Sequence, residues 1–140
     1  MSNNDKEFAK IWKIREDVIV AAAKYGKILS YDISFDVKEW NSMLEELKEE
    51  TKTEIFGYGH IGDGNLHVNI ILKEGQEFKD SYIFEKIAKK KGSISAEHGV
   101  GLHKPKYLHL QKSPQILQIY KQLKQIFDPN GIMNPYKYVP

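Results

Sequence analysis

Gly57-Tyr-Gly-His-Ile-Gly-Asp-Gly-Asn-Leu-His-Val-Asn69 is the stretch that decides the fold. Its Asp63-Gly64 pair predicts a tight hairpin turn between two antiparallel strands, because a primed turn needs positive φ at both central positions and these two residues tolerate it. With the turn centred there, His60 faces His67 across the hairpin, and their Cβ atoms are expected about 5 Å apart. A longer loop over residues 62–65 would keep this pairing.

The second strand of this hairpin alternates between two faces. Leu66, Val68 and Ile70 point toward a core, because successive side chains of a strand lie on opposite sides. Asn69 shares the face of the two histidines. Two imidazoles that reach one point beside a polar neighbour favour a metal site. A polar sheet face without any ligand is the alternative interpretation.

Outward from the hairpin, helices and strands alternate along the chain. We predict a helix over residues 8–24, a strand over 28–35, a helix that Asp36 caps with Glu39 as its capping-box partner, and strands over 53–60 and 65–72. A helix over 77–91 and a short strand over 93–95 complete a β-α-β-β-α-β order. This is the split βαβ pattern of a ferredoxin-like unit, an antiparallel sheet with helices on one face.

Further helices are predicted at both ends of this unit, and the fold class is therefore α+β, with residues 1–140 forming a single domain. The N-terminal helix has Asn3, Asn4 or Asp5 as its cap, and the C-terminal helix begins at Ser113. Each carries an apolar stripe, and that of the C-terminal helix is expected to line its buried side. Apolar surface is also expected to be exposed where an absent part of the protein would pack. The first stripe consists of Phe8, Ile11, Trp12, Val18, Ile19 and Ala22, and the second of Ile116, Ile119, Tyr120, Leu123 and Ile126 or Phe127.

Composition excludes several classes of protein. The chain has 140 residues, a net charge of +2 and no cysteine. Basic residues are spread along the sequence, which argues against nucleic-acid binding. Without thiolates, any metal must be held by nitrogen and oxygen ligands. No apolar stretch approaches the roughly 20 residues of a membrane span, and the N-terminus resembles no signal or transit peptide.

A third metal ligand is best sought in the segment that follows the last predicted strand. Glu97 lies there in a loop flanked by Gly99 and Gly101, where the backbone can adopt unusual dihedral angles. Two histidines and a glutamate form a catalytic zinc set with open positions, and they suit manganese or iron equally. His98 beside Glu97 is placed as a general base, or is a loop histidine without a role.

Three other features of the sequence bear on function. Arg15 lies within the first apolar stripe: either its stem packs and its head reaches solvent, or its guanidinium binds an anion. Gly57, Gly59 and Gly62 match the dinucleotide fingerprint G-x-G-x-x-G, but they lead into a strand instead of a helix, so we reject that function. His103 and His109 are interpreted as surface residues.

Three segments carry a family resemblance: Gly59-His-Ile-Gly-Asp-Gly-Asn-Leu-His-Val-Asn69, Ser93-Ile-Ser-Ala-Glu-His-Gly-Val-Gly101 and Phe127-Asp-Pro-Asn-Gly-Ile-Met-Asn-Pro-Tyr-Lys137. Together they resemble the C-terminal half of FAD-linked oxidases of the vanillyl-alcohol oxidase type, within the branch of D-2-hydroxyglutarate and D-lactate dehydrogenases. Ile11–Glu16 and Tyr31–Ser34 fit the same branch. The resemblance covers the chain from about Ile11 to Pro140.

The resemblance implies an FAD-dependent oxidoreductase that converts a D-2-hydroxy acid to the 2-oxo acid. His60, His67 and Glu97 would bind a divalent metal, zinc being favoured, and His98 would accept the hydroxyl proton and contact substrate. Arg15 and Asn69 would also contact substrate. Asn134 and Lys137 would lie toward the flavin.

The same resemblance implies a division into domains. This chain would be the later part of a substrate-binding cap, with the FAD-binding domain absent, and the isolated chain is expected to be inactive because hydride needs a flavin acceptor. Family likeness favours mitochondria. The electron acceptor is not defined by the sequence, and a homo-oligomer is left open.

Two positions depart from the D-2-hydroxyglutarate branch. Ile19 stands where that branch has a threonine, and Ser30 where it has a lysine, so the substrate is 2-hydroxyglutarate or a shorter acid such as D-lactate; Lys24 or Lys27 could substitute for the lost groups. Two other functions are alternatives: a stand-alone, non-catalytic ferredoxin-like module that binds a metal or ligand, and metal-dependent hydrolysis. Hydrolysis would need a spare carboxylate, and Asp63 at the turn is expected to lie too far away.

Overall fold

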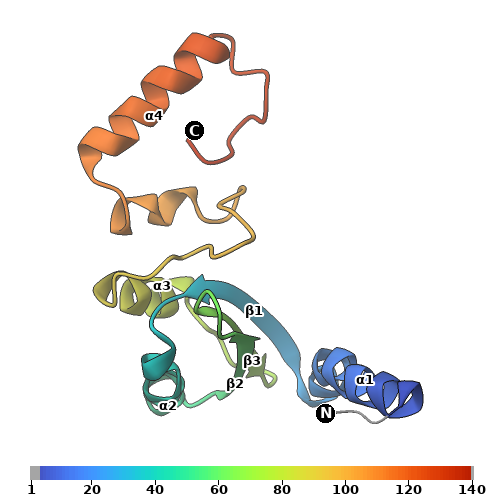
Figure 1. The fold of residues 1–140 in the computed structure, drawn as a ribbon. Coiled ribbons are helices and arrows are strands. Elements are labelled where there is room, and N and C mark those ends of the chain that lie inside the picture. The colour runs from blue at the N-terminus through green and yellow to red at the C-terminus, as the bar shows by residue number, and fades with distance from the viewer. Residues whose placement is uncertain (1–3, 140) are drawn as a thin grey trace.

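The computed structural model describes residues 4–139, and Figure 1 shows their arrangement. Four α-helices and three strands occur within this range, together with three short 3-10 helices. In chain order they are α1 (Asp5–Ala22), η1 (Ala23–Tyr25), β1 (Lys27–Ser34), η2 (Val37–Glu39), α2 (Trp40–Thr51), β2 (Glu54–His60), β3 (Asn65–Leu72), α3 (Asp80–Lys89), η3 (Pro105–Leu110) and α4 (Pro114–Phe127). None of the helices in residues 4–139 combines the length and apolar character needed to cross a membrane.

The strands form one antiparallel sheet in the order β1-β3-β2. The last predicted strand, over residues 93–95, is reduced to a single bridge in which Ser34 and Ser93 exchange backbone hydrogen bonds of 3.0 and 2.7 Å. This bridge lies beside β1, which continues the order expected of a split βαβ unit. The predicted α+β class, with helices against an antiparallel sheet, is confirmed.

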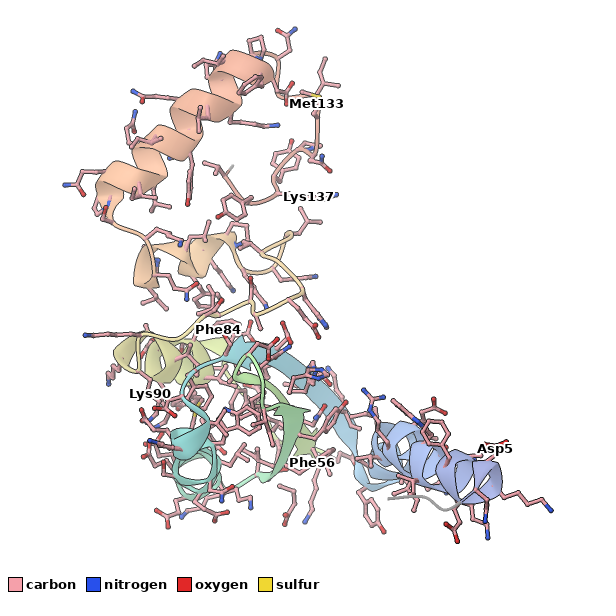
Figure 2. The ribbon with its side chains drawn as sticks, viewed as in Figure 1. Asp5, Phe56, Phe84, Lys90, Met133 and Lys137 are labelled. Atoms are coloured by element: carbon pink, nitrogen blue, oxygen red, sulfur yellow. The ribbon has the colours of Figure 1, made fainter. Side chains whose placement is uncertain are left out.

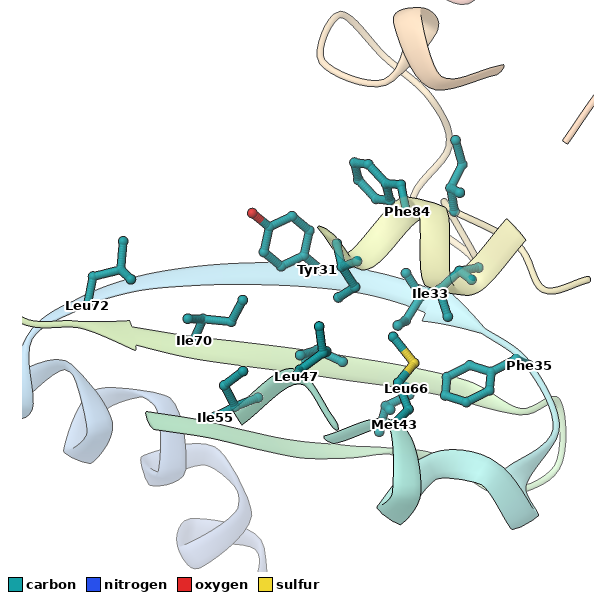
Figure 3. Close-up of a cluster of buried hydrophobic side chains, with 14 residues drawn as sticks. Tyr31, Ile33, Phe35, Met43, Leu47, Ile55, Leu66, Ile70, Leu72 and Phe84 are labelled. Carbon is teal, nitrogen blue, oxygen red and sulfur yellow. The ribbon is translucent and has the colours of Figure 1, made fainter. Parts of the chain in front are cut away.

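The hydrophobic core lies between this sheet and the helices α2 and α3 (Figure 3). The predicted alternation of β3 is confirmed, since Leu66, Val68 and Ile70 are almost completely buried. They pack in one cluster with Met43 and Leu47 of α2, and with Ile33, Ile83 and Ile87. Burial of these apolar side chains is the main stabilising contribution to the fold.

The predicted hairpin register is wrong by two residues, although the predicted face is right. His60 pairs with Asn65, and Tyr58 is the residue opposite His67. Four residues, 61–64, form the loop, and of the two central residues proposed for a primed turn only Gly64 has positive φ. The Asp63 carboxylate accepts a hydrogen bond of 3.0 Å from the Asn65 backbone, an Asx-type turn that closes this longer loop.

Helices α1 and α4 were predicted correctly in position. The prediction that the apolar side of α4 is buried is wrong, whereas the predicted exposed apolar surface is present on both helices. Both helices lie away from the sheet (Figure 1), and Phe8 and Ile11 of α1 are 54% and 57% exposed. Within α4, Ile126 and Phe127 are 71% and 74% exposed. Apolar periodicity identifies a helix face, but a partner must be present to cover that face.

The helix caps agree in part with expectation. The Asn4 side chain accepts a hydrogen bond of 3.0 Å from the Glu7 backbone at the start of α1, whereas Asn3 lies outside the described residues. Asp36 caps η2 through the Lys38 backbone at 3.0 Å. The Glu39 carboxylate forms an ion pair with Lys90, so it ties the start of α2 to the end of α3.

Candidate metal centre

Four side chains that could ligate a metal converge beside the sheet: Asp32, His67, Glu97 and His98. Each contributes one nitrogen or oxygen atom to a group in which all atoms lie within 4.8 Å of one another. Strand pairing explains half of this set, because Asp32 of β1 is the direct partner of His67 of β3. The other two residues come from the loop that follows the bridge at Ser93.

Asp32 is the buried member, with 5% of its surface exposed. Its Oδ2 accepts two backbone hydrogen bonds, 3.1 Å from the nitrogen of Glu97 and 3.2 Å from the nitrogen of His98. Its Oδ1 lies 3.3 Å from Nδ1 of His67. That contact is close but not aligned as a hydrogen bond, so Oδ1 is a buried acceptor with no hydrogen bond from the described residues.

Glu97 lies between two imidazoles. Its Oε1 is 3.7 Å from Nε2 of His67 and 3.6 Å from Nε2 of His98. These distances are too long for hydrogen bonds. They are close to the roughly 3.4 Å that separates two ligand atoms bonded tetrahedrally to one ion at about 2.1 Å. The donor set and its spacing therefore fit zinc, manganese or iron.

His60 lies outside this group of four. Its ring is edge-on to the His67 ring, with centroids 5.3 Å apart, and the residue is exposed. The Tyr58 ring approaches His67 from the opposite position on β2, with centroids 5.2 Å apart. The structure thus brings together His67, Glu97 and His98 of the residues predicted from sequence, and leaves His60 as a diagonal neighbour of His67.

Asn69 occupies the predicted face but is only 1% exposed. Its Oδ1 accepts a hydrogen bond of 2.8 Å from the Ser30 hydroxyl, and its Nδ2 donates to the His67 carbonyl at 3.3 Å. The amide is therefore engaged within the fold. Substrate contact by Asn69 stays a prediction.

The other predicted site residues lie outside the cluster. Arg15 is exposed on α1, where its guanidinium lies 5.1 Å from the centre of the Trp12 ring. Lys137 lies in the segment after α4 (Figure 2) and donates to the Asn134 side chain at 3.3 Å. Both residues are exposed. Their roles toward substrate and flavin also stay predictions.

A lysine lies near the buried carboxylate. Lys104 is half-buried, and burial lowers its pKa, while the charge of Asp32 opposes that change. The ammonium group also lies 5.9 Å from the centre of the Phe84 ring. Lys104 is therefore a half-buried cation whose charge interacts with the Asp32 carboxylate.

A small cavity of about 160 Å³ adjoins Glu97 and is lined by Ser34, Asp63, Asn65, Ala96 and Glu97. Asp63 was expected to lie too far from the metal residues for hydrolysis, and it is outside the group of four although it shares this cavity. The Asn65 amide is buried without a hydrogen bond from the described residues. The cavity has room for several waters that could satisfy it.

Sequence reasoning missed Asp32 as a site residue. Tyr31–Ser34 was recognised only as part of a family likeness, and the Asp32 carboxylate within it was not assigned to the site. A charged residue between buried Tyr31 and Ile33 was the available signal, since buried carboxylates are rare without a partner. Its partner could be identified only through the register between β1 and β3.

The class of protein is given by a family match that covers nearly the whole chain. Residues 1–138 match the family described as "FAD linked oxidases, C-terminal domain", and the chain belongs to that family. The predicted family is thereby confirmed.

Three relatives within the family carry names of particular enzymes. The chain is 37% identical to D-2-hydroxyglutarate–pyruvate transhydrogenase of Saccharomyces cerevisiae, over 99% of this chain and 31% of the relative. It is 38% identical to the mitochondrial D-2-hydroxyglutarate dehydrogenase of Arabidopsis thaliana, over 94% of this chain and 25% of the relative. A Schizosaccharomyces pombe protein provisionally named a mitochondrial D-lactate dehydrogenase is 35% identical, over 99% of this chain and 30% of the relative. The chain thus spans about a third or less of the length of these relatives.

Proposed function

We propose that this chain is the substrate- and metal-binding part of an FAD-dependent D-2-hydroxy acid dehydrogenase. The observation that carries the proposal is the convergence of His67, Glu97 and His98 beside buried Asp32. Relatives named for D-2-hydroxyglutarate support the substrate class. In this proposal the chain is the later part of a substrate-binding cap, and the flavin is held by a separate domain.

His67 and Glu97 are the central metal ligands in this proposal, with Nε2 and Oε1 already 3.7 Å apart. We assign the third ligand to His60, whose ring lies against that of His67. A divalent ion held there, zinc being favoured, would act as a Lewis acid that binds the 2-hydroxy acid and makes its hydroxyl more acidic. His98 could take the third position instead, because its Nε2 is 3.6 Å from Glu97.

His98 is the residue to which we assign proton transfer. Its side chain is 63% exposed, so a substrate hydroxyl can approach Nε2, and its backbone is fixed by the bond to Asp32. A neutral imidazole accepts a proton near neutral pH. FAD, bound mainly by the other domain, supplies the hydride acceptor.

The length of the substrate is a finer part of the proposal. Ser30 replaces a lysine of the D-2-hydroxyglutarate branch, and its hydroxyl is used by Asn69 inside the fold. Arg15 is exposed and available to a carboxylate. We therefore propose D-2-hydroxy acids as the class, with D-lactate and D-2-hydroxyglutarate as the two acids to compare. The names of the relatives favour mitochondria as the location.

Isothermal titration calorimetry of the chain with Zn²⁺ tests the metal assignment. We expect binding in the wild type, and at least a 10-fold weaker affinity in His67→Ala and in Glu97→Gln. His103→Ala is the matched control, because this exposed histidine lies outside the group. No zinc binding by the wild type, or an equal loss in the control, would overturn the assignment.

Two further variants separate the remaining roles. His60→Ala should weaken zinc binding if His60 is the third ligand, whereas His98→Ala should leave it within about 2-fold. In a protein that joins this chain to its flavin domain, His98→Ala should slow flavin reduction by D-lactate or D-2-hydroxyglutarate about 100-fold or more. The reverse pattern of zinc affinities would exchange the two assignments.

A further inference from the structure

Asp32 contacts three of the groups on which the proposed centre depends, although no function predicted from the sequence uses it. One carboxylate oxygen holds the backbone of Glu97 and His98, and the other faces His67. We propose that Asp32 is a positioning residue that fixes both the loop carrying Glu97 and the tautomer of His67. This inference rests on the function proposed above.

The two carboxylate oxygens of Asp32 contact different groups. Oδ2 is occupied by two N–H donors at 3.1 and 3.2 Å, so consecutive peptide groups of the loop are tied to β1. This fixes the backbone from which the Glu97 and His98 side chains extend. Charge-assisted bonds of this kind are stronger than bonds between neutral groups.

Oδ1 determines which nitrogen of His67 carries the proton. It is a buried acceptor, 3.3 Å from Nδ1, to which no group within residues 4–139 donates a hydrogen bond. A small rotation of the ring lets an Nδ1–H donate to it. A proton on Nδ1 leaves the lone pair of Nε2 free, and Nε2 is the nitrogen that faces Glu97.

The same geometry argues that Asp32 supports the centre without being a ligand. Nδ1 and Nε2 of one imidazole point in widely different directions, so Asp32 and Glu97 approach His67 from different sides. With Oδ2 already holding two N–H groups, the remaining oxygen is directed at the ring nitrogen. Metal-binding histidines commonly donate their other N–H to a carboxylate in this way.

Asp32→Asn separates this role from a general structural role. The amide oxygen can replace Oδ2 and keep both loop bonds, which places the NH₂ group against Nδ1 of His67. An NH₂ donor there requires an unprotonated Nδ1, so the proton moves to Nε2 and blocks the nitrogen that faces Glu97. Loop geometry is retained while the tautomer is reversed.

Nitrogen-15 NMR of the metal-free chain at about pH 8 reads the tautomer of His67 directly. We expect Nδ1–H for His67 in the wild type and Nε2–H in Asp32→Asn, with the Glu97 and His98 amides still protected from hydrogen exchange. A wild-type His67 that carries its proton on Nε2 overturns the proposal, and this measurement needs no variant.

Zinc titration provides the second measurement. Asp32→Asn should bind Zn²⁺ about 10- to 100-fold more weakly, as expected when such a support is lost. Asp36→Asn is the matched control, because its carboxylate also accepts a backbone N–H but lies outside the group. Unchanged affinity in Asp32→Asn, or a metal bound to Nδ1, contradicts the proposal. The tautomer is measured without metal, so failure of zinc binding alone would count against the proposed function only.

Discussion

Gly59→Ala is the substitution that tests the structure of the β2–β3 hairpin most sharply. Gly59 lies opposite Leu66, next to His60. A Cβ atom at this position would lie 2.0 Å from the Asn65 carbonyl oxygen and 3.0 Å from Cα of Leu66. Both are backbone atoms, so no side-chain rotation can relieve the overlap.

The cost of that overlap can be estimated. An ordinary carbon–oxygen contact is about 3.3 Å, so the strands must separate locally by roughly 1.3 Å. Overpacking costs about 1–3 kcal/mol, and each weakened backbone hydrogen bond adds about 1 kcal/mol. We expect a loss of about 3 kcal/mol in the free energy of unfolding. For 140 residues, at about 2.1 cal/mol/K per residue, this lowers Tm by about 10 °C.

Urea and thermal unfolding followed by circular dichroism provide the assay. Gly62→Ala is the control, because a Cβ atom there would have no atom of the described residues within 4 Å and its φ lies outside the left-handed region. Its stability should remain within about 0.5 kcal/mol of the wild type. If Gly59→Ala is equally stable, Gly59 does not lie against Asn65 and the register described here is wrong.

Three other outcomes are expected. Tyr31→Phe removes the 2.7 Å hydrogen bond to Asp80 and should cost about 1 kcal/mol near neutral pH. Burial, and then the bond to Asp80, raises the pKa of Tyr31, so the Tyr31 hydroxyl stabilises the fold fully below the unfolded pKa of 10.0 and less above it. The difference in free energy of unfolding between wild type and variant, measured with urea, should therefore narrow from about pH 10 upward. A difference that stays constant with pH would contradict this. Leu47→Ala removes a side chain with 0% exposure and should lower the free energy of unfolding, measured with urea, by about 2–5 kcal/mol. Leu123→Ala, at a residue 46% exposed on α4, should lower it by less than about 0.5 kcal/mol. Equal losses would show that the core does not lie at Leu47. Replacing exposed Ile126 and Phe127 with lysine should reduce self-association in sedimentation velocity without lowering Tm. A monodisperse, monomeric wild type would show that this face of α4 does not mediate self-association.

Local features of the fold were predictable from local sequence. Alternation over Leu66, Val68 and Ile70 predicted which face of β3 is buried, because side chains of a strand alternate strictly. The hairpin itself was predicted, but its register was not, because the Asp63 carboxylate bonds to the Asn65 backbone and stabilises a four-residue loop. The same dipeptide supports either loop.

Features that depend on distant parts of the chain were less predictable. The apolar stripes of α1 and α4 were correctly assigned to helices. Exposed apolar surface was predicted, but periodicity could not show that it lies on these two helices. Asp32 was missed for a related reason. Its importance arises from pairing with His67, 35 positions later in the sequence, and from the loop that returns to it after Ser93.

Because α1 and α4 lie apart from the sheet, either helix can unfold locally while the sheet stays folded. Their backbone bonds are closed mainly within each helix, whereas β1, β2 and β3 share ladders and a common core. Fraying of either helix need not expose that core. Amide protons of Asp5–Ala22 and Pro114–Phe127 should therefore exchange through shallow local openings, and those of β3 only when the whole sheet comes apart.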